Sequence, residues 1–157
     1  MATDVKQLKA DLTAAGIEIY RTKKTEIHVA ERLRLHIMDS GIRLQILETG
    51  AGEDGPSSSP TGERLRITFT ARSQRSDFPD SDDAVLFEKV RSALGPTATA
   101  RGFAEAGAAA VEVKDPMDAA HVLDVWHEVT YQKETGDTGA AVDEIRWALG
   151  LERYIHD

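Results

Sequence analysis

Apolar and polar side chains alternate one by one along three segments in the first half of the chain. These segments cover residues 32–37, 42–46 and 64–72. Successive side chains of a β-strand point to opposite faces of its sheet, so the alternation predicts strands with one buried and one exposed face. We therefore expect a meander of long antiparallel strands between about residues 26 and 72.

A tight turn at residues 40–41 fits the join between the first two of these strands. With a two-residue loop there, Ile37 pairs with Leu44 and His36 pairs with Gln45. Apolar then meets apolar and polar meets polar, whereas a one-residue slip would turn every side chain to the opposite face. The pattern thus predicts a hairpin with this register.

The exposed face of the predicted strands is rich in arginine. We use the name arginine face for Arg32, Arg34, His36, Arg43, Arg64, Arg66 and Arg72. Gln45, Thr68 and Thr70 follow the same alternation, and none of these positions is a carboxylate. Like charges opposite each other destabilise a sheet. Three sources of negative charge could offset the face: the acidic C-terminal half of the chain, an acidic protein partner, or phosphate groups.

Helices are predicted at both ends of the chain and after the third strand. The first covers 3–15, with Gly16 at its stop position. The next begins at Asp80 or Ser81 and ends at Leu94, because Gly95-Pro96 has the composition of a helix end.

The region after this helix allows two interpretations. Alternation suggests one or two strands around Gly107, and Asp115-Pro116 has the composition of a helix start. We favour a short helix over 116–123 followed by a strand, because residues 125–131 are rich in β-branched and aromatic side chains. Whether residues 124–133 form a strand or continue the helix stays open.

The last predicted helix, over about 139–155, has two apolar stripes. Val142, Ile145 and Leu149 form one of them, and Trp147, Leu151 and Tyr154 form the other. One stripe can face the sheet. The second then predicts a symmetric homodimer contact through Trp147, Leu151 and Tyr154.

These elements predict a single α+β domain over residues 1–157, an antiparallel sheet with helices packed mainly on one face. Residues 50–63 hold little that could build a core and are expected to be a flexible loop. The chain has no cysteine, and its first residues lack the apolar stretch of a secretory signal. With no long apolar run, these features favour a cytoplasmic protein without a membrane segment.

Charge is divided unequally along the chain, whose net charge is −8. Residues 1–76 hold 12 Lys/Arg and 10 Asp/Glu, while residues 77–157 hold 7 and 17. The negative total argues against nucleic acid as a partner, because the long-range field would repel phosphate.

One group of side chains could bind a metal ion. His121, Asp124 and Glu128 would share a face if their segment were helical, and imidazole with carboxylates suits zinc, iron or manganese. If the segment is a strand, the group disappears, and on a helix such a row is more often a solvated face.

Two further patterns lack the context their chemistry requires. Residues 50–55 match G-x-G-x-x-G, but no helix start follows them. Asp77, Asp80, Asp82 and Asp83 lack the glycine and glutamate of a calcium-binding loop. The sequence therefore indicates no cofactor.

The function predicted from the sequence is a non-catalytic cytosolic protein-binding or regulatory protein that docks partners on the arginine face. Its partner would be an acidic protein or a second copy of the chain. The alternative is a small metal-dependent or anion-processing enzyme.

Overall fold

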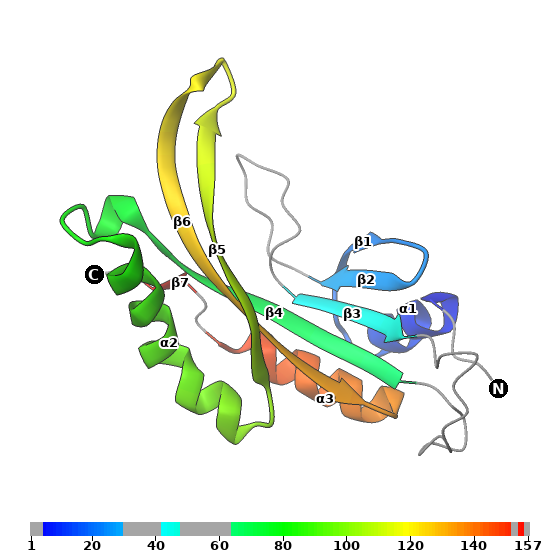
Figure 1. Ribbon diagram of the computed structural model, residues 1–157. Helices are drawn as coiled ribbons and strands as arrows, with labels where there is room; N and C mark the ends of the chain where they lie inside the picture. Colours follow the sequence, from blue (N-terminus) through cyan, green and yellow to red (C-terminus); the bar gives the residue numbers. More distant parts are fainter. Residues whose placement is uncertain (1–4, 30–41, 48–63, 152–153, 156–157) are drawn as a thin grey trace, which may run out of the picture. The chain divides into compact units, whose positions relative to one another are not determined.

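The structure is a computed structural model that describes residues 5–29, 42–47, 64–151 and 154–155 (Figure 1). The elements are α1 (Val5–Ala14), β1 (Ile19–Thr22), β2 (Glu26–Val29), β3 (Ile42–Leu47), β4 (Arg64–Gln74), a 3-10 turn (Arg75–Asp77), α2 (Asp83–Ala100), β5 (Ala104–Asp115), β6 (Asp118–Thr135), α3 (Thr138–Leu149) and β7 (Tyr154–Ile155).

The strands form one sheet in the order β1-β2-β3-β4-β6-β5, and β7 joins β4. Neighbours from β1 to β4 are antiparallel, as are β5 and β6, while the short β7 runs parallel to β4. The predicted α+β class with an antiparallel sheet is confirmed. None of the described helices combines the length and the apolar character needed to cross a membrane.

The chain divides into two compact units. Unit 1 holds Met1–Phe69 and Lys133–Leu151, and unit 2 holds Thr70–Gln132 and Glu152–Asp157. Two strands, β4 and β6, continue from one unit into the other. The single domain over residues 1–157 stays a prediction.

Unit 1 buries the apolar face of its strands against α1 and α3. Leu8 and Leu12 come from α1, and Ala141, Ile145 and Ala148 come from α3. The strands supply Ile27, Val29, Ile42, Leu44, Leu65, Ile67 and Phe69, all of them buried. Gly16, with φ 82°, closes α1, and the N–H of Ile17 donates to the carbonyl oxygen of Leu12 at 2.9 Å. These contacts confirm the predicted first helix and the alternation of β3 and β4.

The predicted pairing of the first hairpin is wrong on the side of β3. Residues 30–41, including the segment 32–37, lie outside the described residues. Leu44, however, pairs with Ile27 of β2 and with Ile67 of β4. Both edges of β3 are therefore occupied, one by β2 and the other by β4. The alternation could not identify these neighbours, because Ile27 is as suitable an apolar partner for Leu44 as Ile37 is. The predicted loop over 50–63 also lies outside the described residues.

In unit 2, α2 covers the sheet face that carries His127, Val129 and Tyr131. The helix buries Leu86, Val90, Leu94 and Ala98. Phe87 meets the ring of His127 edge-on, with centroids 5.0 Å apart. The hydroxyl of Ser73 donates to the carbonyl oxygen of Leu86 at 2.9 Å. Among the elements described in unit 2, no helix covers the opposite face, which carries Trp126, Glu128 and Thr130.

The predicted end of the second helix at Leu94 is wrong. α2 continues through Gly95 and Pro96 to Ala100. Its end is a Schellman motif at Gly102, where φ is 95° and the N–H of Phe103 donates to the carbonyl oxygen of Ala98 at 2.9 Å. Pro96 costs the helix a backbone hydrogen bond, but Ala98 and Phe103 are buried beyond it. Burial of the following turn thus outweighs the local stop signal.

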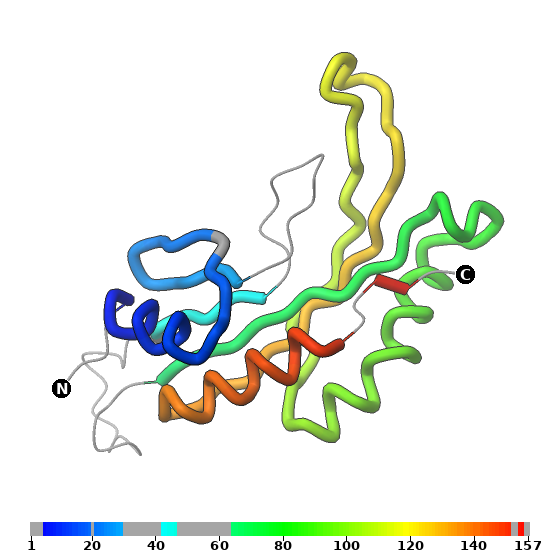
Figure 2. The backbone as a smooth tube through the Cα atoms, turned by 180° about the vertical axis from the view of Figure 1, so that it is seen from behind, coloured from blue at the N-terminus to red at the C-terminus, as the bar shows by residue number. Residues whose placement is uncertain are grey.

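The predicted short helix over 116–123 is also wrong. Asp115 pairs with Asp118, and β5 and β6 form one long hairpin, seen in both views (Figures 1 and 2). The carboxylate of Asp115 accepts the N–H of Met117 at 2.9 Å, which makes an Asx turn. Asp followed by Pro suits a turn as well as a helix start. The strand predicted over 125–131 is confirmed as part of β6.

The last helix is shorter than predicted. It ends at Leu149, and Tyr154 and Ile155 belong to β7. Gly150 caps the helix, and its N–H donates to the carbonyl oxygen of Trp147 at 3.1 Å. Trp147 and Tyr154 therefore do not share a helical stripe.

Candidate functional site

The arginine face is partly described, and its described members in unit 1 lie on one face of the sheet. Arg43 pairs with Thr68, and Gln45 pairs with Arg66, as the alternation predicts. Arg32, Arg34 and His36 lie outside the described residues.

Carboxylates accompany these arginines in unit 1. Arg43 lies 3.8 Å from Glu26, and Glu134 accepts hydrogen bonds from Arg64 and, at 3.1 Å, from Arg66. The hydrogen bond from Arg64 is the largest cause that lowers the pKa of Glu134. Glu134 belongs to the acidic C-terminal half, so one of the three predicted sources of negative charge is present at Arg64 and Arg66.

Sequence reasoning missed Glu26 as a member of this face. Glu26 pairs with Gln45, and its carboxylate lies 2.8 Å from Nε2 of the buried His28. The signal was available, because Glu26 and His28 alternate with the apolar Ile27 and Val29.

Arg72 lies in unit 2 and is almost fully buried, with 5% of its surface exposed. Its guanidinium lies over the ring of Trp126, 4.8 Å from the centroid. The positive charge of Arg72 also acts on Glu128. The structure thereby brings together Arg72 from the arginine face and Glu128 from the predicted metal group.

The other two candidate metal ligands do not join Glu128. β6 is a strand, so side chains at positions 121 and 128 point to opposite faces in a regular strand and are about 23 Å apart along it. Asp124 instead accepts hydrogen bonds from the backbone N–H and the hydroxyl of Ser76, at 3.0 and 2.8 Å. The described part of the chain contains no group of three or more side chains placed to hold a metal ion.

The acidic segment before α2 has structural roles. Asp82 caps the helix and accepts the N–H of Val85 at 3.0 Å. Asp83 bonds to Arg75 and lies 2.9 Å from Nε2 of His127, and the bond to His127 is the largest cause that lowers the pKa of Asp83. His127 is fully buried and its Nδ1 has no partner among the described residues.

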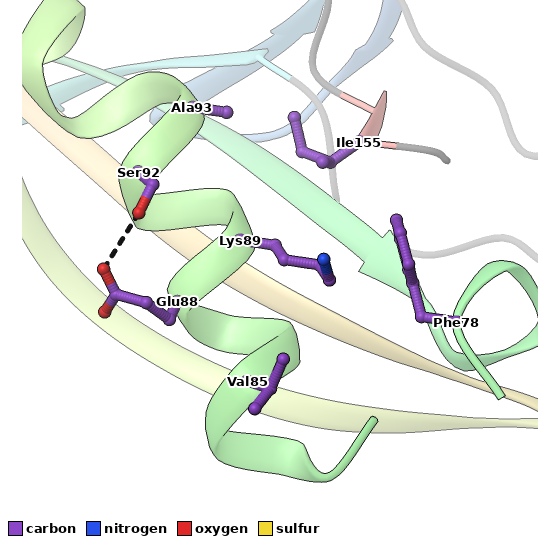
Figure 3. A pocket seen from close by; sticks show the side chains of 7 residues that line it. All are labelled: Phe78, Val85, Glu88, Lys89, Ser92, Ala93 and Ile155. Atoms are coloured by element: carbon purple, nitrogen blue, oxygen red, sulfur yellow. Dashed lines mark hydrogen bonds between the residues drawn. The ribbon is translucent and has the colours of Figure 1, made fainter. Parts of the chain in front are cut away.

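A cavity of about 570 Å³ lies along α2 in unit 2 (Figure 3). Its lining consists of Phe78, Val85, Glu88, Lys89, Ser92, Ala93 and Ile155. The polar groups there are already engaged: Nζ of Lys89 lies 4.4 Å from the centroid of Phe78, and Ser92 donates to Glu88 at 2.9 Å. Nothing in this lining selects a particular ligand.

The residues predicted for a dimer contact have other surroundings. Trp147 meets Phe69 edge-on inside unit 1, with centroids 5.8 Å apart. The hydroxyl of Tyr154 donates to Gln74 at 3.1 Å inside unit 2. Leu151 follows the end of α3 and is half-buried. The homodimer stays a prediction, but the stripe that suggested it is absent from α3.

The β5–β6 hairpin has an unusual surface. Every residue from Ala104 to Ala110 is exposed, and six of these seven are alanine or glycine. Near the tip, Met117 is 91% exposed, and Val122 and Leu123 are also exposed. β5 is the end strand of the sheet, and no described strand pairs with its outer edge.

Glu128 lies near the middle of the paired stretch of this hairpin, beside a hollow of about 340 Å³. The hollow is lined by Ala106, Gly107, Ala108, Ala109, Glu128 and Thr130. Ala109 is directly opposite Glu128 on the neighbouring strand. A Cβ built on Gly107 would meet no atom within 4 Å, so the side of the hollow next to β5 is open.

The carboxyl group of Glu128 is in an unfavourable environment. Its Oε2 is buried and has no hydrogen-bond partner among the described residues. Burial raises the pKa of Glu128, and the charge of Arg72 lowers it by less. A buried carboxylate oxygen without a hydrogen-bond partner costs free energy.

Comparison with family models, with curated proteins and with solved structures gives no match.

Proposed function

We propose that this protein is a non-catalytic protein-binding protein and that the β5–β6 hairpin is its docking surface. The observation that supports this proposal is the exposed run Ala104–Ala110 on an end strand. Natural sheets protect an end strand with lysine, proline or a covering segment, because an open edge pairs with other chains. Residues 104–110 contain no lysine and no proline.

The arginine face is less suited to this role than the sequence suggested. In unit 1, Glu26 and Glu134 already lie beside Arg43, Arg64 and Arg66. An acidic partner would have to compete with these carboxylates. Docking of an acidic protein on the arginine face remains a second proposal.

Site-specific photocrosslinking tests the hairpin. A photoreactive side chain is placed at Ala110 on β5 or at Met117 at the tip, and the protein is irradiated in native lysate. We expect adducts with the same partner at both positions, identified by mass spectrometry. Lys9, exposed on α1, is the control position.

Two results would contradict the proposal. Adducts at Lys9 as abundant as those at the hairpin would indicate nonspecific contact. No adduct at Ala110 or Met117, with efficient crosslinking at Arg43 or Arg64, would move the docking surface to the arginine face.

A further inference from the structure

We infer that the outer edge of β5 binds an extended segment of a partner as an added strand, with a lysine or arginine side chain of that segment in the hollow beside Glu128. This inference rests on the proposed function and specifies the chemistry of the partner. Strand addition combines backbone hydrogen bonds, which give affinity, with side-chain pockets, which give specificity.

The edge of β5 offers a regular stretch for such pairing. Gly107–Val113 pairs without interruption with Asp124–Thr130 of β6, and register shifts lie on both sides of this stretch. Alternate residues of a strand direct their N–H and C=O groups away from the neighbour they already pair with. Those groups of β5 have no strand partner among the described residues.

The hollow is within reach of a long side chain on an added strand. Neighbouring strands are about 4.8 Å apart, so an added strand would lie about 10 Å from β6, with β5 between them. Ala109 separates the added strand from Glu128 and has only a methyl group there. A lysine or arginine on the guest strand can therefore extend over Ala109 into the hollow that Glu128 lines and approach its carboxylate.

The negative charge of the β5–β6 hairpin favours a basic partner segment. Residues 104–123 contain four carboxylates, Glu105, Glu112, Asp115 and Asp118, and one lysine, Lys114. Residues of unit 2 hold 13 Asp/Glu and 7 Lys/Arg. The charged group that faces Glu128 from β4 is Arg72, whose guanidinium rests on Trp126, while β5 contributes only alanine and glycine to the hollow. The β5 side is thus the open approach for a cation.

A second copy of the chain fits this edge less well. Pairing of two β5 strands would join two hairpins that each have four carboxylates and one lysine. Repulsion between like charges opposes that arrangement.

Synthetic peptides test the inference on the full-length protein. The basic peptide is about seven residues long, with lysine at alternate positions and valine or threonine between them, matching the length of the regular edge. The acidic peptide has glutamate in place of each lysine. Two further basic peptides are methylated on alternate backbone nitrogens, one on each set, because only one set can face β5.

We expect the basic peptide to bind and the acidic peptide not to bind in titration calorimetry. One methylated peptide should lose binding, and the other should keep it. Glu128→Gln should weaken binding of the basic peptide by about tenfold or more, since the lost group is a desolvated charge. Glu112→Gln is the matched control, because it removes the same charge from the same hairpin. Glu112 is at an exposed position of β5, and its side chain lies on the face of the strand opposite to that of Ala109.

Three outcomes would overturn the inference. These are equal binding of the acidic peptide, equal loss of affinity in Glu128→Gln and Glu112→Gln, and full binding of both methylated peptides. Dimerisation that the basic peptide does not disrupt would assign the edge to a second copy and would also overturn it. If crosslinks form at Ala110 and Met117 while the basic peptide fails to bind, the docking surface stands and this inference alone is wrong.

Discussion

Glu128 should reduce the stability of the protein at neutral pH. Burial raises the pKa of Glu128, so folding disfavours the charged form of its carboxyl group relative to the unfolded chain. A group of this kind contributes stability below its unfolded pKa, and that contribution is lost as the pH rises through the folded pKa. Glu128→Gln should therefore raise the melting temperature at pH 7, and the gain should vanish below about pH 4, where glutamate is protonated in both states.

Thermal melts across this pH range provide the measurement, with Glu112→Gln as the exposed control. The control should stay within about 0.5 kcal/mol of wild type, as surface substitutions usually do. A stability gain of Glu128→Gln that persisted unchanged at low pH would show that the charge of Glu128 is not its cause.

At the scale of single residues, the sequence predicted faces better than it predicted partners. Alternation placed Arg43 and Arg66 on one face, and the register confirms it. It could not supply Glu134, which is 68 positions from Arg66 in sequence. That contact depends on β4 lying beside β6, and the alternation of a strand does not identify its neighbour.

At the scale of elements, the two glycines at the end of α2 should respond oppositely to alanine. Gly95 lies inside the helix, and a Cβ there would meet only the hydroxyl of Tyr131 at 3.9 Å, an ordinary contact. Gly95→Ala should stabilise the protein by about 0.5–1 kcal/mol through helix propensity. Gly102 has φ 95°, so Gly102→Ala should destabilise it by about 1–2 kcal/mol.

Urea denaturation of both variants measures these changes. If α2 ended at Leu94 with Gly95 as its stop, as the sequence suggested, the signs would be reversed: alanine would be strained at position 95 and tolerated at position 102. The signs of the two stability changes therefore show at which of the two glycines α2 ends.

The glycine and proline residues that predicted helix ends and starts were correct guides where tertiary packing agreed with them and wrong where it did not. Gly16 ends α1 as predicted, because the chain beyond it turns to bury Ile17. Gly95-Pro96 and Asp115-Pro116 have equally strong composition, yet one lies inside a helix and the other forms a hairpin turn. Burial of Ala98 decided the first case, and long pairing between β5 and β6 decided the second.

At the scale of the whole molecule, charge distribution separates two uses of the arginine face. If Arg43, Arg64 and Arg66 serve mainly to pair with Glu26 and Glu134, changing all three to glutamine should lower stability by about 1 kcal/mol, because partly exposed pairs are individually weak. Glu134→Gln should lower the stability too, and high salt should reduce both effects.

The pKa of Glu134 is lowered by its arginines, so the stability that Glu134 contributes is present above its unfolded pKa and is lost as the pH falls through its folded pKa.

Denaturation at low and high salt, together with capture of an acidic partner, measures these effects. An arginine face that is open to such a partner predicts the opposite result: the triple variant would be as stable as wild type or more stable, and it would lose the partner. Equal stability with every partner retained would leave the face as solvated surface.

The register shifts around Gly107–Val113 limit the length of strand that can pair regularly with the edge of β5. A bulge adds twist and displaces the following residues from the ladder. A guest of seven residues can match the regular stretch, and on both sides of it the register between β5 and β6 shifts. If β5 binds an added strand as proposed, these irregularities would disfavour growth of the sheet by repeated addition of long strands, as in a fibril.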